Sequence, residues 1–174
     1  AVRAIEWGVR HATHLYNAMS GLTHRGPGVV GACFDMGRTY GLQAELICDG
    51  FHIHPAALRV AFSQMGEDGT VIVSDSMCAA GHKDGEYDLG GQTVYVRDGK
   101  ALLADGTIAA STSNMYAELK NVISHGVPMK QAVKSATIRL SALFVRTDAR
   151  YAPLAFISKF IYFCECASNE AKNS

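Results

Sequence analysis

Three segments that carry histidine or aspartate stand out, because each follows a short apolar run with the pattern of a β-strand. The segments are ATHLYNAM with His14, CDGFHIHP with Asp49 and His52, and VIVSDSM with Asp75. Neutral imidazole is a common metal ligand, and a carboxylate can take a proton from a reacting water and later return it. These residue types together suit hydrolysis by a metal-activated water.

Each of these residues also has a structural interpretation. A single histidine such as His14 is often a hydrogen-bonded core or surface residue, and an aspartate such as Asp75 often caps a helix. A bare carboxylate at the end of a buried strand is nevertheless costly unless it is paired or bound to metal. His52 is preferred over His54 as the functional histidine. The two side chains of an extended HxH segment point to opposite sides, and His54 precedes Pro55 at an expected helix start.

Two further positions combine polar chemistry with glycine. Arg25 lies in THRGPG, where a guanidinium suits bidentate contact with phosphate and glycine neighbours expose backbone donors. A solvated loop arginine is the alternative interpretation. Gly50, inside the DGFH turn, permits unusual dihedral angles or a close backbone approach to a ligand. The mixed-charge stretch of residues 82–91 is expected to be a solvated loop without chemistry.

The elements that must position these residues alternate between strands and helices. Strands are expected at residues 12–16, 40–48 and 70–74, and the Asp-Gly-centred alternation of residues 92–105 predicts a β-hairpin. This alternation favours a parallel sheet, and in (β/α)-barrels the active site lies at the carboxyl ends of the strands. One helix is expected to end near Val9, and a second is expected from Pro55 to about Gly69. A third is expected from a cap at Thr112 or Ser113 to His125, and a fourth from Pro128 to about Thr137. Residues 21–31 are expected to form a glycine-rich loop.

Composition and charge argue against several classes of protein. The chain has 174 residues, 48% of them hydrophobic, with 16 basic and 16 acidic side chains. A neutral chain without a basic run gives no reason to expect nucleic acid, and no apolar run reaches the roughly 20 residues of a spanning helix. The five scattered cysteines contain no CxxC pair, which argues against a disulfide framework and fits a reducing cytoplasm. We therefore expect a cytoplasmic protein that binds neither nucleic acid nor membrane.

Taken together, the segments resemble one family in order and approximate spacing. HATHLYNAM, THRGPGVVGA, DGFHIHP, VIVSDSMCAAG, GTIAAS and NMYAELKNVISHG resemble the N-acetylglucosamine-6-phosphate deacetylases of the amidohydrolase superfamily. The combination of HLYNAM with DGxHxHP is specific. The resemblance covers about residues 1–137 and implies an α/β fold. It implies the last three strands and following helices of a (β/α)8 TIM-type barrel, with a β-hairpin insertion.

The resemblance implies an enzyme that hydrolyses the N-acetyl group of N-acetylglucosamine 6-phosphate. His14 matches a metal-binding histidine after the sixth barrel strand, and Asp75 matches the catalytic acid/base after the eighth. His52 would polarise or orient the acetamide. Arg25 matches a phosphate-binding arginine that in this family can serve a neighbouring subunit's site, and a homodimer is implied for the full-length enzyme. The implied substrate-binding positions are Asn17, Ala18, Arg25, Asp49, Gly50, Phe51, His52, Ile108, Ala109 and Ala110.

A divalent metal ion is the implied cofactor, with zinc first and iron or another divalent ion as alternatives. The chain departs from the family in three ways. The half that supplies the first five barrel strands and the remaining glutamate and histidine ligands is absent, and Ala110 stands where a glycine is usual. The resemblance also stops after about Thr137, so residues 138–174 are expected to be a divergent tail that is disordered or frameshifted.

Two alternative functions stay open beside the deacetylase. One is an inactive fragment or pseudoenzyme, because three strands cannot close a barrel and one histidine cannot hold a catalytic metal. The other is a different amidohydrolase, such as a deaminase or a cyclic-amide hydrolase. Asn17 and Arg25, as residues of a phosphate-type loop, argue against this second alternative.

Overall fold

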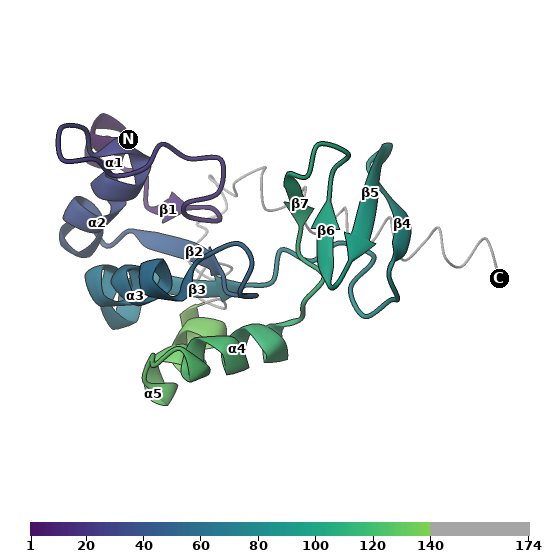
Figure 1. The fold of residues 1–174 in the computed structure, drawn as a ribbon. Coiled ribbons are helices and arrows are strands. Elements are labelled where there is room, and N and C mark those ends of the chain that lie inside the picture. Colours follow the sequence, from purple (N-terminus) through teal and green to yellow (C-terminus); the bar gives the residue numbers. More distant parts are fainter. Residues whose placement is uncertain (140–174) are drawn as a thin grey trace, which may run out of the picture. The chain divides into compact units, whose positions relative to one another are not determined.

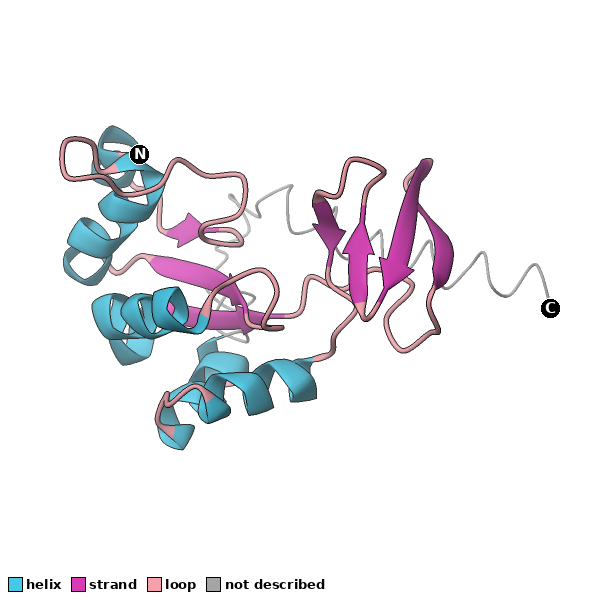
Figure 2. Cartoon of the chain, in the orientation of Figure 1, coloured by secondary structure: helices cyan, strands magenta, loops and turns pink. Residues whose placement is uncertain are grey.

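The computed structural model describes residues 1–139. These residues form two compact units, one of residues 1–74 and 114–139 and the other of residues 75–113. Figures 1 and 2 show a parallel sheet with helices in the first unit and a small antiparallel sheet in the second. The predicted mixed α/β architecture is confirmed. The predicted divergent tail lies outside the described residues, apart from its first two positions.

The sheet of the first unit contains three parallel strands. They are β1 (His11–Ala12), β2 (Gln43–Ile47) and β3 (Thr70–Val73), with β2 in the centre. Ala44 pairs with Ala12 on one side and with Thr70 on the other. All five residues of β2 are buried, as is typical of a parallel strand that is covered on both faces. Because the strands are parallel, their carboxyl ends lie at one edge, the edge where His14 and Asp49 follow β1 and β2.

Helices connect the strands and cover the sheet. Both α4 and α5 contact β3, and α3 contacts β2 as well as β3 (Figure 1). The chain thus alternates strand, helix and strand, as in βαβ units. The helices of this unit are α1 (Val2–Glu6), α2 (Gly28–Tyr40), α3 (Pro55–Gly69), α4 (Met115–Ser124) and α5 (Met129–Ala136). No helix among the described residues is both long enough and apolar enough to span a membrane.

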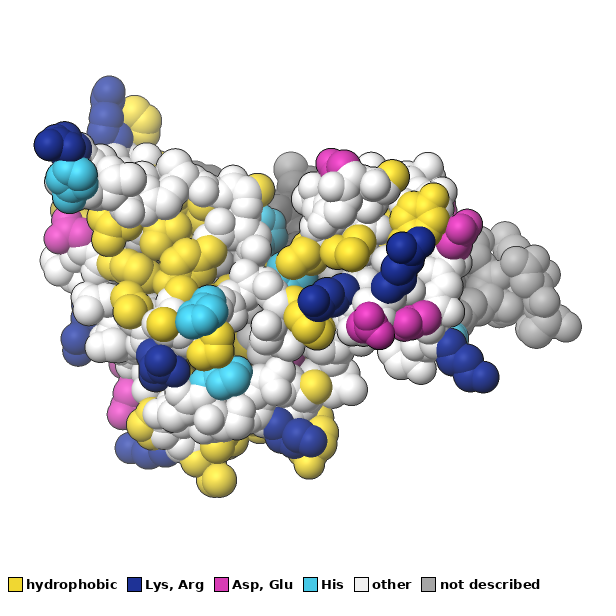
Figure 3. Space-filling model, viewed as in Figure 1, with side chains coloured by type: hydrophobic (Ala, Val, Ile, Leu, Met, Phe, Trp, Pro, Cys, Tyr) yellow, Lys and Arg dark blue, Asp and Glu magenta, His cyan; other side chains and the backbone are white. Residues whose placement is uncertain are grey.

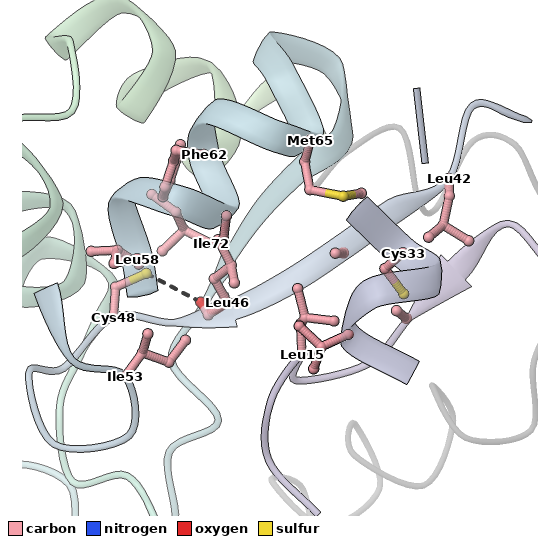
Figure 4. Packing of buried hydrophobic residues seen from close by; sticks show 14 of the residues in the cluster. Leu15, Cys33, Leu42, Leu46, Cys48, Ile53, Leu58, Phe62, Met65 and Ile72 are labelled. Carbon is pink, nitrogen blue, oxygen red and sulfur yellow. Dashed lines mark hydrogen bonds between the residues drawn. The ribbon is translucent and has the colours of Figure 1, made fainter. Parts of the chain in front are cut away.

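Apolar side chains from the sheet and the helices form the core of the first unit. Leu46 and Ile72 from the strands meet Leu58 and Phe62 from α3 (Figure 4), and all four are almost fully buried. Leu58, Phe62 and Met65 recur at helical spacing, so α3 buries one stripe of its surface. Among the described residues β1 and β3 each have a single neighbouring strand. Figure 3 shows further apolar side chains gathered on the surface around α2, β2 and α3.

The boundaries predicted around β1 and α2 are wrong. The strand expected at residues 12–16 ends at Ala12, because His14 and Tyr16 take positive φ values of 38° and 81° that no strand permits. The glycine-rich loop expected at residues 21–31 ends where α2 begins. The amide of Val29 there donates to the side-chain oxygen of Ser20, at 3.1 Å, and this bond supports the start of the helix.

The end of α2 also shortens the next predicted strand. The strand expected at residues 40–48 begins only at Gln43, because α2 continues to Tyr40 and ends at Gly41 in a left-handed conformation with φ of 64°. The start predicted for α4 is also wrong. Asn114 caps this helix, and its side-chain oxygen accepts from the amide of Ala117 at 3.0 Å, so neither Thr112 nor Ser113 does. The helices expected after Pro55 and Pro128 and the strand from Thr70 are confirmed.

The second unit is an antiparallel sheet in the order β4-β5-β6-β7. Its strands are β4 (Gly85–Leu89), β5 (Gln92–Arg97), β6 (Lys100–Leu102) and β7 (Ile108–Ala110). The predicted hairpin is confirmed at β5 and β6, where Asp98 and Gly99 take φ values of 49° and 72°, as a type I′ turn requires. The solvated loop predicted at residues 82–91 is wrong, because β4 lies within it. Tyr87 and Leu89 alternate with charged residues and pack against the small core, so the strand has one apolar side.

Candidate active site

The turn of residues 49–52, which we call the 49–52 turn, follows β2 at the carboxyl edge of the parallel sheet. Asp49 Oδ1 accepts hydrogen bonds from the amides of Phe51 and His52, at 2.8 and 2.9 Å, and Oδ2 lies 2.7 Å from Nδ1 of His52. The side chains of Asp49 and His52 are 3% and 8% exposed. Gly50 has φ of 87°, in the region that favours glycine. The aspartate thus builds this turn from bonds within four residues.

The charge of Asp49 orients the His52 ring. Burial alone would raise the pKa of Asp49, but the hydrogen bonds from the His52 side chain and from the amides of His52 and Phe51, with the charge of His52, lower it from 3.8 to about 2. The ionised carboxylate can only accept, so Nδ1 of His52 carries the proton that is shared with it. Nε2 is then the nitrogen presented to a ligand, as an acceptor in the neutral ring and as a donor in the protonated ring. It has no hydrogen-bond partner among the described residues.

The turn of residues 14–18, which we call the 14–18 turn, follows β1 and depends on a buried carboxylate of the neighbouring strand. Oε2 of Glu45 accepts from the amide of His14 at 3.2 Å, and its Oε1 lies 2.9 Å from Nε2 of His11. The backbone carbonyl of Glu45 accepts from the amide of Leu15 at 2.8 Å. Glu45 is only 3% exposed. Sequence patterns did not single out Glu45, although it holds the turn that carries the predicted metal ligand.

The described residues fit one ligand position of a divalent metal ion. Nδ1 of His14 is buried and has no hydrogen-bond partner within residues 1–139, so one ring nitrogen of a neutral imidazole is not used by the fold. A catalytic zinc usually takes three protein ligands. No group of three His, Cys, Asp or Glu side chains suited to a metal ion is found within the same residues. His14 therefore fits as one donor of a larger set, and the described residues do not form a complete metal site.

The predicted phosphate-contacting residues lie in the connection between β1 and α2. The side-chain amide of Asn17 lies 3.4 Å and 3.5 Å from the carbonyl oxygens of His14 and Leu15, long distances for hydrogen bonds. Ala18 is exposed and has φ of 55°, which directs the backbone out of helical or extended geometry. Asn17 and Ala18 therefore belong to the same irregular turn as His14, at the carboxyl edge of the sheet.

Arg25 lies at the tip of a tight exposed turn. The amide of Thr23 donates to the carbonyl of Gly26 at 2.8 Å and closes the turn. Nη1 of Arg25 lies 2.5 Å from Nε2 of the neighbouring His24. Because the arginine side chain is exposed, its guanidinium remains accessible to an anion in solution. Both the phosphate-binding and the solvated interpretation of Arg25 are compatible with this geometry.

The remaining predicted site residues belong to the second unit. Asp75 comes two residues after β3 in the sequence and has φ of 49°. Its carbonyl accepts from the amide of Ser111 at 3.1 Å, and Ser76 and Ser111 form a parallel bridge. Ser111 directly follows β7, the strand that contains the predicted substrate positions Ile108, Ala109 and Ala110. The second unit thus brings the predicted acid/base next to the predicted substrate segment, whereas His14 and His52 follow neighbouring strands of the first unit.

Helix α4 also forms hydrogen bonds with Cys48, the residue before the 49–52 turn. The carboxylate of Glu118 accepts from the amide of Cys48, and the side-chain amide of Asn121 donates to the carbonyl of Cys48 at 3.2 Å. Glu118 is 0% exposed. Burial, followed by the charges of Glu118 and Asp49, raises the pKa of the Cys48 thiol well above its usual value, so the thiol stays neutral. Sequence patterns did not indicate either helix residue, although Glu118 precedes Val122 by one helical turn and so shares its buried face.

Known amino-sugar phosphate deacetylases are similar to this chain over part of their length. No protein-family model matches the chain. The chain is 48% identical over 112 residues to the N-acetylglucosamine-6-phosphate deacetylase of Bacillus subtilis, and the match covers 64% of this chain and 28% of that protein. It is 38% identical over 126 residues to an Escherichia coli protein provisionally named N-acetylgalactosamine-6-phosphate deacetylase, and the match covers 72% of this chain and 73% of that protein.

A solved structure is similar in fold as well as in sequence. It is a mutant N-acetyl-D-glucosamine-6-phosphate deacetylase from Mycobacterium smegmatis in complex with N-acetyl-D-glucosamine 6-phosphate. The TM-score is 0.75 at 32% identity, and the match covers 80% of this chain and 38% of that chain. The chain therefore spans less than two fifths of the length of the Bacillus and Mycobacterium proteins that it matches.

Proposed function

Because the chain belongs to the family of N-acetylglucosamine- and N-acetylgalactosamine-6-phosphate deacetylases, we propose that it takes part in hydrolysis of N-acetylglucosamine 6-phosphate to glucosamine 6-phosphate and acetate. This reaction would belong to amino-sugar catabolism. The observation that carries the proposal is the 49–52 turn, in which Asp49 holds Nδ1 of His52 at 2.7 Å and leaves Nε2 for a ligand. The turn lies at the carboxyl edge of a parallel sheet, where enzymes with (β/α)-barrels place their active sites.

The parallel sheet would form the last part of a (β/α)8 barrel. Three features support this proposal: parallel order, helices between the strands, and a TM-score of 0.75 to a deacetylase structure. Among the described residues β1 and β3 have one strand neighbour each, whereas every strand of a closed barrel has two. The rest of the family's polypeptide would supply the missing neighbours and the remaining metal ligands.

The residues of this chain would take the following roles in the reaction. A divalent metal ion held by His14 and by ligands from the rest of the polypeptide would supply Lewis-acid polarisation and a more acidic water. Nε2–H of a protonated His52 would donate to the acetamide oxygen as negative charge develops on it. The carboxylate of Asp75 would take the proton of the attacking water and pass it to the departing amine nitrogen. Arg25, Asn17 and the backbone at Ala18 would bind the sugar phosphate.

Acetate release by a chimera tests the deacetylase proposal. The matched segment of the Bacillus subtilis relative is replaced by the corresponding segment of this chain, and the 6-phosphates of both N-acetylglucosamine and N-acetylgalactosamine are assayed. We expect metal-dependent acetate release. Asp75→Asn should lower kcat by at least about 100-fold with little change in KM, whereas Asp105→Asn, at an exposed turn of the same unit, should not.

Two outcomes would contradict these assignments. A folded chimera without acetate release would favour the inactive fragment or pseudoenzyme. Near-normal turnover of the Asp75→Asn variant would leave Asp75 a structural carboxylate.

The phosphate assignment is tested in the same chimera. Arg25→Ala should raise KM for the phosphorylated sugar by about ten-fold or more, because one charge-assisted hydrogen bond contributes roughly 1.5–3 kcal/mol. KM for the unphosphorylated sugar should change little. An equal loss with both sugars would remove the phosphate role and favour a different amidohydrolase activity.

A further inference from the structure

Helix α4 holds both backbone groups of Cys48, the residue that precedes the 49–52 turn. The amide of Cys48 donates to Glu118, and the carbonyl of Cys48 accepts from Asn121 at 3.2 Å. The paired register of β2 and β3 ends at Ile47 and Val73, so Cys48 lies just beyond the ladder. Buried backbone groups require hydrogen-bond partners. Two side chains of α4, three residues apart and on one face of the helix, supply these partners where the sheet does not.

The choice of a glutamate for this contact is costly. Glu118 is fully buried. Cys48 is 2% exposed, and Figure 4 shows the Cys48 side chain beside Leu46 and Leu58. Burying an acidic side chain is unfavourable unless hydrogen bonds replace its lost hydration, and the amide of Cys48 supplies one such bond to Glu118. Glu118 thus gives a firm position to the backbone at the end of β2.

The position of the Cys48 backbone affects the position of His52 through Asp49. Asp49 follows Cys48, and its carboxylate accepts the amides of Phe51 and His52 and the ring Nδ1 of His52. The side-chain amide of Asn121 also lies beside Gly50, 3.8 Å from the place a Cβ would take there. Because Asp49 directly follows Cys48, a shift of the Cys48 backbone would move the Asp49 carboxylate, loosen its bond to Nδ1 and turn the His52 ring. Its Nε2 would then point away from the ligand.

We propose that Glu118 and Asn121 are positioning residues, which fix the backbone of Cys48 so that His52 presents Nε2 to the substrate acetamide. The inference rests on the deacetylase proposal for the role of Nε2. The placement of the His52 ring can be measured without turnover. Neither α4 residue would touch the substrate; both would act through the 49–52 turn.

Nitrogen NMR of the histidine rings in the 174-residue chain tests the positioning. In the natural chain the His52 Nδ1 proton should exchange slowly with solvent, because Asp49 accepts it. Glu118→Ala should speed this exchange by at least about ten-fold, since the buried amide of Cys48 loses its acceptor. Glu118→Gln, which keeps an acceptor oxygen, should restore most of the protection. Asn121→Ala, at a half-buried position, tests the same idea if Glu118→Ala does not fold.

Val122→Ala is the matched control on the same helix. Val122 is fully buried and makes no contact with Cys48 through a hydrogen bond. This substitution loosens the packing of α4 but should leave the His52 proton protected. Equal effects of Val122→Ala and Glu118→Ala, or no effect of Glu118→Ala and Asn121→Ala, would overturn the inference.

The chimera separates this inference from the function. There Glu118→Ala should lower kcat at least about ten-fold more than it raises KM, as expected when an interaction of the transition state is lost. If the NMR result holds and no chimera releases acetate, the deacetylase proposal fails and the positioning stands. If acetate is released and kcat is unchanged in Glu118→Ala, the positioning role in catalysis fails.

Discussion

The two turns at the carboxyl edge of the parallel sheet are built in opposite ways. In the 14–18 turn, His14, Tyr16 and Ala18 take φ values of 38°, 81° and 55°, which are unfavourable for residues that carry a Cβ. In the 49–52 turn only Gly50 has a positive φ, at 87°. The backbone of the second turn therefore suits its own sequence, whereas the backbone of the first turn must be held by other parts of the fold.

The contacts of the two turns differ in the same way. Glu45 holds the amide of His14, and the hydroxyl of Tyr16 donates to the carbonyl of Ala57 at 2.8 Å. The ring of Tyr16 also meets Phe34 edge-on, with 6.1 Å between ring centroids. By contrast, the three bonds that the Asp49 carboxylate accepts all come from its own turn. One edge of one sheet thus carries one turn whose internal geometry comes from local bonds and one turn whose internal geometry comes from tertiary contacts.

The largest effect is expected from removal of Glu45. Glu45→Ala should lower the free energy of unfolding by about 3 kcal/mol, because the partly buried ring of His11 and amide of His14 both lose their hydrogen-bond partner. Urea unfolding measures the loss, and amide NMR locates it. The signal of Leu15 should shift and that of Phe51 should not. Glu45→Gln, which keeps one acceptor oxygen, should cost less than half as much. Equal shifts in both turns would contradict the division between them.

Protonation of Asp49 should affect the 49–52 turn alone. The pKa of Asp49 in the folded chain is about 2, below the ordinary 3.8. The carboxylate therefore stabilises the fold above the ordinary value, and this contribution is lost as the pH falls through about 2. Asp49→Asn should remove about 2 kcal/mol at neutral pH together with this part of the acid dependence. Midpoints of urea unfolding, measured from neutral pH down to about pH 2, test whether stability falls with pH as expected. Asp35→Asn, at an exposed position on α2, is the control. An unchanged acid dependence in Asp49→Asn would show that the carboxylate is not held as described.

Adding a side chain at Gly50 should also destabilise the second turn. Gly50→Ala should cost about 1–2 kcal/mol, because a Cβ is disfavoured in this backbone conformation. Steric crowding does not cause this loss of stability, since a Cβ at residue 50 would meet only Asn121, at an ordinary distance of 3.8 Å. Gly21→Ala is the matched control, at a position with an ordinary φ and nothing within 4 Å. Thermal unfolding of both variants compares them. A similar change in the two would remove the backbone argument.

The smallest effect should have the opposite sign and should appear in the first turn. Ala18→Gly should raise the free energy of unfolding by about 0.5 kcal/mol, because relief of the left-handed conformation slightly exceeds the entropy cost of glycine. Ala117→Gly, in α4, should instead lose about 1 kcal/mol. Denaturant titrations of both variants can resolve the difference in sign. Loss of stability in Ala18→Gly would show that the backbone at residue 18 carries no strain.

Local signals in the sequence predicted the elements that depend on local chemistry. Pro55 starts α3, Thr70 starts β3, and Asp98 with Gly99 turns the predicted hairpin. The residue types of the DGFH segment alone indicated a chemically competent turn. The start of α2 was missed, because it depends on a bond from Val29 to Ser20, nine residues away. The strand β4 was missed, because its charged residues concealed an alternating apolar side.

The sequence by itself determined the family, the order of the site segments and the internal geometry of the 49–52 turn. Only the tertiary structure decided what holds those segments in place. Glu45 and Glu118 bond to backbone groups 31 and 70 residues away along the chain. A dihedral preference or a short-range hydrogen bond is a property of a few adjacent residues, so it can be predicted from them. The partner of a buried carboxylate is a property of the packed core, because burial and proximity exist only once distant segments have met.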